Sequence, residues 1–187
     1  MQAIDNALLR EMIGWGEALP PLWTFARGLT ELGGSRWLVP LTLAVAAWLT
    51  SRGHRRHAAA LLLVTFGGRA VVEIMKWALA RTRPDFIDHP VVVHSLSFPS
   101  GHAGNSMIAY LALALIAGPL LTRGRLPAAA AVLLAVAIGL TRPILGVHWP
   151  TDVLAGWTLG VAWTLSAVWA LSGWMEGRPV SRPPRAS

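Results

Sequence analysis

The stretch SFPSGH (residues 97–102) is followed at once by the apolar run AGNSMIAYLALALIAGPLL (residues 103–121). A hydrocarbon core about 30 Å thick needs roughly 20 helical residues, so the run predicts a transmembrane helix. The Pro-Ser-Gly-His sequence before it predicts the point where that helix begins. Unpaired backbone N–H groups and the helix dipole favour an anion at such a point, and Gly101 has no Cβ to block its approach.

The composition of the chain is that of a membrane protein. Its 187 residues are 54% hydrophobic and only 13% charged, with a mean hydropathy of +0.51. Soluble domains usually carry about a quarter charged residues, so the surrounding solvent is predicted to be lipid. Ten tryptophans fit this interpretation, because indole rings favour the boundary between hydrocarbon and headgroups. The chain has no cysteine, which excludes disulfide and thiolate chemistry.

Apolar runs predict an all-α fold, a polytopic membrane helix bundle with five transmembrane helices. The expected spans are residues 36–50, 58–80, 103–121, 127–140 with an extension, and 153–174. The first and fourth are short, which implies local thinning of the bilayer or burial against neighbouring helices. We expect one membrane-embedded domain over residues 1–174 and a basic disordered tail over residues 175–187.

Residues 1–34 are amphipathic rather than uniformly apolar, which predicts a segment that lies in the membrane interface. The pair Pro20-Pro21 is expected to break it into two pieces, a hairpin or a kinked helix. Counted as one unit, this segment and the five spans make six helical segments. A sixth span is the alternative. Asp5 and Glu11 fall where a secretion signal would be apolar, so a cleaved leader is not expected.

Basic residues predict the orientation of the bundle. The connectors SRGHRRH (residues 51–57) and TRGR (residues 122–125) and the C-terminal tail all fall on one face. The positive-inside rule makes that face cytoplasmic and places SFPSGH on the extracytoplasmic side of the cell (inner) membrane. Topology alone therefore explains much of the net charge of +7, and nucleic acid is not an expected partner.

Polar residues gather in three stretches on the predicted extracytoplasmic face. They are KWALARTRP (residues 76–84), PSGH (residues 99–102) and TRPILGVHWPTD (residues 141–152). Lys76, Arg83 and Arg142 would place three cations around the helix start at Ser100 and Gly101. That is more charge than one carboxylate requires, and a phosphate fits it better. Arg81 has no position in these patterns and could equally be an ordinary residue at a span end.

Two histidines and an aspartate supply reactive groups. His148 and Asp152 are spaced as one helical turn, and Trp149-Pro150 predicts the start of that helix. The carboxylate can accept a hydrogen bond from one imidazole nitrogen and leave the other nitrogen to attack. His102, from a separate segment, could then protonate a leaving oxygen. Either histidine alone would more simply be a packing residue, but together with the arginines they favour catalysis.

Together, these three stretches resemble the signature motifs of the type 2 phosphatidic acid phosphatase superfamily, the integral-membrane lipid phosphate phosphatases. Thr141 stands where that family more often has serine, and a hydroxyl remains. The resemblance implies that His148 is a phosphohistidine nucleophile, Asp152 its partner and His102 the general acid. It also implies that phosphoryl oxygens are held by Lys76, Arg83, Arg142, Ser100 and the Gly101 amide, with no metal and no cofactor.

The expected function is therefore hydrolysis of a lipid phosphate or diphosphate headgroup through phosphohistidine. Undecaprenyl diphosphate, phosphatidylglycerophosphate and phosphatidate are candidate substrates, and the lipid bilayer is the expected surrounding partner. Three alternatives stay open at this point. The phosphoryl group could pass to another lipid, the site could hold vanadate as in the similar haloperoxidases, or the protein could bind phospholipid without catalysis.

Overall fold

The computed structural model describes residues 2–84, 96–121 and 128–177, and every regular element in these ranges is helical. The helices are α1 (Gln2–Ala18), α2 (Pro20–Glu31), α3 (Ser35–Ser51), α4 (Arg55–Leu79), α5 (Gly101–Ala112), α7 (Ala128–Ile144) and α8 (Pro150–Met175). After α5 the chain continues through the π-helical turn η1 (Leu113–Ala117) into α6 (Gly118–Leu121). The all-helical expectation is confirmed. Residues 178–187 of the expected tail lie outside the described ranges.

Each expected span corresponds to a helix, but the helices differ in whether they are long enough to cross a membrane. In the described residues, α4, the run Gly101–Leu120 and α8 are long and apolar enough to cross a membrane. The pair α2 and α3, bent by 44° at its break, qualifies as a fourth span if it crosses as one unit. α7 is apolar but shorter. The chain is a multi-pass helical protein, and the count of five spans stays a prediction.

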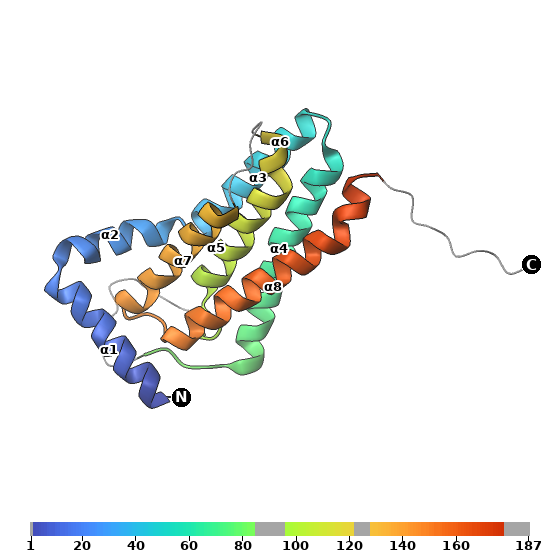
Figure 1. Cartoon of the computed structure of the whole chain (residues 1–187). Coiled ribbons are helices and arrows are strands. Elements are labelled where there is room, and N and C mark those ends of the chain that lie inside the picture. Colours follow the sequence, from blue (N-terminus) through green and yellow to red (C-terminus); the bar gives the residue numbers. More distant parts are fainter. Residues whose placement is uncertain (1, 85–95, 122–127, 178–187) are drawn as a thin grey trace, which may run out of the picture.

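The helix that follows SFPSGH lies at the centre of the bundle. α5 packs against α4, α7 and α8, as Figure 1 shows. In the most apolar window of the run Gly101–Leu120, which α5 begins, 78% of residues are buried, against 39% in α4 and 22% in α8. The outer helices therefore turn large apolar side chains such as Trp77 and Trp169 outward, where lipid is the solvent they suit.

Glycines allow α5 and α8 to pack closely. A Cβ on Gly156 would come 2.8 Å from the Ser100 carbonyl oxygen and 2.9 Å from the Gly104 nitrogen. A Cβ on Gly160 would come 2.8 Å from Met107. Small residues of this kind let helix backbones approach one another in lipid, where apolar burial gives little preference for helix contact. The contact at Gly156 also fixes the start of α5, where the motif residues lie.

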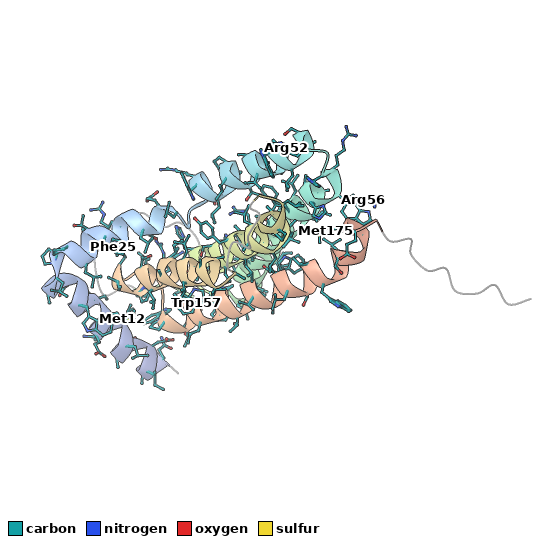
Figure 2. The ribbon with its side chains drawn as sticks, turned by 45° about the horizontal axis from the view of Figure 1, so that its top comes forward. Met12, Phe25, Arg52, Arg56, Trp157 and Met175 are labelled. Atoms are coloured by element: carbon teal, nitrogen blue, oxygen red, sulfur yellow. The ribbon has the colours of Figure 1, made fainter. Side chains whose placement is uncertain are left out.

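Tryptophans join the outer helices. The Trp163 indole donates to the Val64 carbonyl at 2.8 Å and lies against Gly67 and Gly68, whose lack of a side chain lets α4 and α8 pack closely. The Trp157 indole, labelled in Figure 2 between α7 and α8, donates to the Ala135 carbonyl at 3.2 Å. Several tryptophans thus hold helices together rather than marking the membrane boundary.

The N-terminal segment breaks where the proline pair predicts. α1 ends at Ala18, Leu19 precedes α2, and Pro20 occupies the first turn of α2, where its missing N–H costs no hydrogen bond. Both helices pack against α7. In Figure 1 they extend away from the bundle and return α1 toward the beginning of α8. Placement of this segment in the membrane interface stays a prediction.

The two ends of the bundle differ in character. Arg52 and Arg56 lie at the end that carries Met175, far from Met12 on α1 and Phe25 on α2 (Figure 2). The motif stretches lie at the other end, with α1 and α2. This arrangement agrees with the predicted separation of basic connectors from the polar motifs, while the side of the membrane that each end faces stays a prediction.

Replacing Gly156 with alanine tests the contact between α5 and α8. The added methyl group meets backbone atoms that cannot rotate away, so we expect a loss of roughly 1–3 kcal/mol of stability and displacement of the start of α5. The unfolding temperature of Gly156→Ala should fall, and so should the lipid phosphatase activity that the motifs lead us to expect. Gly173→Ala in the same helix is the matched control, because nothing lies within 4 Å of its added Cβ. Equal behaviour of the two variants would contradict this packing.

Candidate active site

Four helix ends meet at one end of the bundle and bring the three motif stretches together. These are the C-terminal ends of α4 and α7 and the N-terminal ends of α5 and α8. Backbone groups at helix ends have no partner within their own helix, so the polar residues of the site gather where the bundle has polar groups to offer. All residues predicted for the site lie here: Lys76, Arg83, Ser100, Gly101, His102, Arg142, His148 and Asp152.

His148 and Asp152 form the expected pair. His148 Nδ1 lies 3.4 Å from Asp152 Oδ2, and both side chains are almost completely buried. Trp149 is the N-cap of α8 and Pro150 its first residue, which confirms the predicted helix start. Asp152 Oδ2 also accepts a hydrogen bond from the Trp149 amide at 3.1 Å. The carboxylate therefore caps its own helix and faces the imidazole with the same oxygen.

Arg83 decides which nitrogen of His148 carries the lone pair. Its NH1 lies 2.9 Å from His148 Nε2 and also donates to the Val147 carbonyl at 2.5 Å. Burial lowers the pKa of Arg83 to about 10, against the opposing effect of Asp152, so the guanidinium is charged near neutral pH. A charged guanidinium can only donate, so Nε2 must accept and the ring proton belongs on Nδ1, toward Asp152.

The other predicted cations surround the same point. Lys76 is 4% exposed, and its ammonium donates to the Leu96 carbonyl at 3.1 Å. A Cβ built on Gly101 would lie 3.5 Å from Lys76 Nζ, so the lysine lies against the start of α5. Arg142 is 2% exposed, and its NH1 donates to the Thr30 hydroxyl on α2 at 2.7 Å. These positive charges converge in an apolar bundle, where an anion would offset their cost.

His102 lies at the first turn of α5, among the same charges. Its ring interacts electrostatically with Arg142, His148, Lys76 and Arg83. It also lies beside the turn between α2 and α3, because a Cβ on Gly33 would come 3.3 Å from its Cδ2 atom. His102 on α5 is thus brought near His148, which lies in the turn between α7 and α8, as the sequence predicts.

Several buried polar atoms at this end lack a hydrogen-bond partner within the described ranges. They are the Ser100 hydroxyl, Arg142 Nε and the amide oxygen of Asn105. Buried polar groups are normally paired, and unpaired ones at a helix start beside cations indicate a place for a ligand. The hydroxyl and the guanidinium both suit phosphoryl oxygens. Among the residues that the structure describes, no cluster of three or more histidines and carboxylates has the make-up of a metal site.

Sequence reasoning missed residues that act on the pair from outside the motifs. The Ser97 hydroxyl donates to Asp152 Oδ2 at 2.5 Å and lies 3.4 Å from His148 Nδ1. Ser97 is the first residue of SFPSGH and completely buried, so its place beside the helix start was a usable signal. Thr30 offered no such signal, because nothing in the chain order links α2 to Arg142. Arg81 binds two carboxylates rather than lying free at a span end.

A multi-pass helical protein whose buried cations surround an imidazole–carboxylate pair has the parts of a phosphoryl-transfer enzyme. The comparison with known families agrees. A family model described as the PAP2 superfamily matches residues 57–176, which is more than half of the chain. The chain belongs to the PAP2 superfamily, and the resemblance read from the three motifs is confirmed.

Individual relatives are named lipid phosphatases. Phosphatidylglycerophosphatase B of Bacillus subtilis is 35% identical over 140 residues, which cover 72% of this chain and 68% of the relative. The decaprenylphosphoryl-5-phosphoribose phosphatase of Mycolicibacterium smegmatis is 35% identical over 142 residues, covering 73% of this chain and 72% of the relative. This chain is accordingly an enzyme, a membrane phosphatase of lipid phosphates. The non-catalytic alternative is not supported.

A solved structure supports the fold as well. The crystal structure of a transmembrane PAP2-type phosphatidylglycerolphosphate phosphatase from Bacillus subtilis superposes with a TM-score of 0.80 at 30% identity. The superposition covers 97% of this chain and 89% of that chain, so it includes α1 and α2 as well as the helices that carry the motifs.

The pH dependence of activity tests the environment of His148. Burial lowers the pKa of His148 well below 6.5, and the charges of Arg83, Arg142 and Lys76 lower it further. The imidazole therefore stays neutral as pH falls through 6.5, and protonation removes its lone pair only at lower pH. We expect the acid limb of kcat/KM to lie below 6.5, once the ionisation of the substrate is measured separately. A limb at or above that value would contradict this environment.

Proposed function

We propose that this phosphatase hydrolyses its lipid substrate through a phosphohistidine formed on His148. The observation that carries the proposal is the orientation of one imidazole. Nδ1 faces Asp152 Oδ2 at 3.4 Å, while Nε2 faces Arg83 at 2.9 Å. A phosphoryl group held by that guanidinium would lie against the nitrogen that carries the lone pair. The 3.4 Å separation is long for a hydrogen bond, as is common before substrate binds.

In the first step, His148 Nε2 attacks phosphorus and the bond from phosphorus to the lipid oxygen breaks. Asp152 stabilises the positive charge that develops on the ring by accepting from Nδ1–H. His102 donates a proton to the leaving oxygen, and the lipid departs as an alcohol from a monophosphate or as a lipid phosphate from a diphosphate. His102 is assigned this part because it lies on α5 near the phosphate-binding cations, while the nucleophile comes from the turn before α8. The negative charge of a bound phosphate would favour the protonated ring against those cations.

In the second step, water attacks phosphorus and the P–N bond breaks. His102, now neutral, takes a proton from that water, and Nε2 regains its lone pair as inorganic phosphate forms. Charge that develops on the phosphoryl oxygens throughout is stabilised by Lys76, Arg83 and Arg142. The Ser100 hydroxyl and the Gly101 amide at the start of α5 add neutral donors. Side-chain cations thus supply the charge stabilisation that magnesium gives in kinase-type sites.

The substrate is a phosphate or diphosphate ester on a lipid. The relatives support a choice of first candidate, since one curated relative and one solved structure are named for phosphatidylglycerophosphate. We propose this lipid first and undecaprenyl diphosphate second, because a relative from Sulfolobus acidocaldarius, 34% identical over 93 residues, is named for that activity. The positive-inside rule supports a site that opens on the extracytoplasmic side.

Replacing the nucleophile tests the mechanism. We expect His148→Ala to lower phosphate release from a lipid phosphate by at least about a thousandfold, as is typical when a covalent nucleophile is lost. Wild-type enzyme should also form an acid-labile, base-stable phosphoenzyme that His148→Ala lacks. Phosphate release should persist in EDTA. Strict dependence on added magnesium, or full turnover by His148→Ala, would contradict the mechanism.

A panel of lipids tests the substrate. Phosphatidylglycerophosphate should give a higher kcat/KM than phosphatidate and undecaprenyl diphosphate, with phosphate release measured on purified enzyme in mixed micelles. His148→Ala in the same micelles is the control for contaminating phosphatases. Adding an acceptor lipid distinguishes hydrolysis from transfer, because phosphorylated acceptor would appear at the expense of free phosphate. A clear preference for another headgroup would overturn the first candidate.

A further inference from the structure

We propose that Asp5 and Arg81 are positioning residues, which hold the catalytic Asp152 carboxylate from the N-terminal helix. The inference rests on the proposed role of Asp152 as the partner of His148. Neither residue belongs to the three motifs, and Asp5 lies outside the matched range of residues 57–176. The family match therefore does not assign this contact.

Arg81 joins two carboxylates that are far apart in the chain. Its NH1 donates to Asp152 Oδ1 at 2.6 Å, and its NH2 donates to Asp5 Oδ2 at 2.7 Å. The side chains of Asp5 and Asp152 are 1% and 0% exposed. Without the guanidinium, two buried carboxylates would face each other with a strong mutual repulsion. Arg81 is also held in place by the Trp149 ring, whose centroid lies 5.4 Å from its Cζ atom.

Asp5 also caps α8 from outside that helix. Its Oδ1 accepts from the Thr151 amide at 3.1 Å, and its Oδ2 accepts from the Thr151 hydroxyl at 2.6 Å. The same hydroxyl accepts from Arg81 NH1 at 2.8 Å. The amide is one of the donors that have no partner within α8, and a negative charge at that end suits the helix dipole. Asp5 thus fixes both Arg81 and the helix turn that carries Asp152.

The two carboxylate oxygens of Asp152 contact different partners. Oδ1 is occupied by Arg81, while Oδ2 accepts from Ser97 and the Trp149 amide and faces His148. Because a carboxylate is planar, a partner on one oxygen sets the direction of the other. The guanidinium of Arg81 is planar as well, so the contact of Asp5 with NH2 orients NH1 toward Asp152. Loss of either contact should misalign the imidazole without removing any group that binds phosphate.

The experiment measures kcat and KM on the full-length enzyme with a soluble short-chain lipid phosphate. A hydrogen bond to a charged group corresponds to roughly tenfold to a hundredfold in rate, so we expect Asp5→Asn to lower kcat about tenfold and Arg81→Gln about a hundredfold. KM should change by less than about twofold, because the phosphate-binding groups remain. Glu11→Gln, an exposed charge on the same helix, is the matched control and should retain wild-type kcat.

The double variant distinguishes positioning from stability alone. With Arg81 replaced, Asp5 can no longer act on Asp152 through the guanidinium and keeps only its contacts with Thr151, so Asp5→Asn should lower kcat by clearly less in the Arg81→Gln background than it does alone. Losses that multiply, or a wild-type kcat in Asp5→Asn, would overturn the inference.

If Asp5→Asn does not fold, the variant Arg81→Lys provides the test. One ammonium cannot serve both carboxylates in the same way, so kcat should fall between those of Arg81→Gln and wild type, and a wild-type kcat would overturn the inference.

His148→Ala in the same assay separates this inference from the proposed mechanism. Activity that survives His148→Ala would refute the mechanism itself. An inactive His148→Ala together with a fully active Asp5→Asn would refute only the positioning role.

Discussion

The burial of like charges is the constraint on which the rest of the structure depends. Lys76 and Arg142, which are buried, and Arg83, which is half-buried, converge at one end of a helix bundle whose other surfaces suit lipid, and the carboxylate of Asp152 lies near them. Burying charges of one sign together is costly, and a bound anion would offset part of that cost. The same cost that would destabilise an empty pocket gives a bound phosphoryl group its affinity. The same cluster of positive charges would therefore both destabilise the site without a ligand and stabilise a bound phosphoryl group.

Helix ends make this concentration of charge possible in lipid. Within a span every backbone group is paired along the helix, and polar side chains find few partners there. At the ends, carbonyl groups such as those of Leu96 and Val147 accept from Lys76 and Arg83, and the start of α5 offers free donors. Close packing at Gly156 then keeps the start of α5 against α8, so that the backbone donors of α5 and the His148–Asp152 pair keep their relative positions. The contacts that hold these helix ends together are consequently also the contacts that position the residues of the site.

The sequence predicted the helices and the motif residues well because both follow from local patterns. Apolar runs of membrane length define the helices, and polar residues next to them must lie near helix ends. The break at Leu19 also followed from a local cause, the proline pair. Tertiary partners such as Thr30 and Asp5 could not be predicted, since no spacing links α2 to Arg142 or α1 to Arg81. The sequence does not distinguish a role for Arg81 in the site from that of an ordinary residue at a span end. Its partners, Asp5 and Asp152, are too far away in sequence to be linked to it by helical spacing.

Thr30 and Asp5 show that residues far from the motifs in sequence support the side chains of the site. Groups that touch phosphate must match its geometry, so they come from a few helix ends with fixed spacing. Groups behind them need only present a hydroxyl or a carboxylate at the right point, and different segments can do so. α2 supplies a hydroxyl to Arg142 and α1 a carboxylate to Arg81, so both N-terminal helices contact residues of the candidate site. An amphipathic segment suits this position, because one face can hold polar contacts with the site while the other meets the membrane boundary.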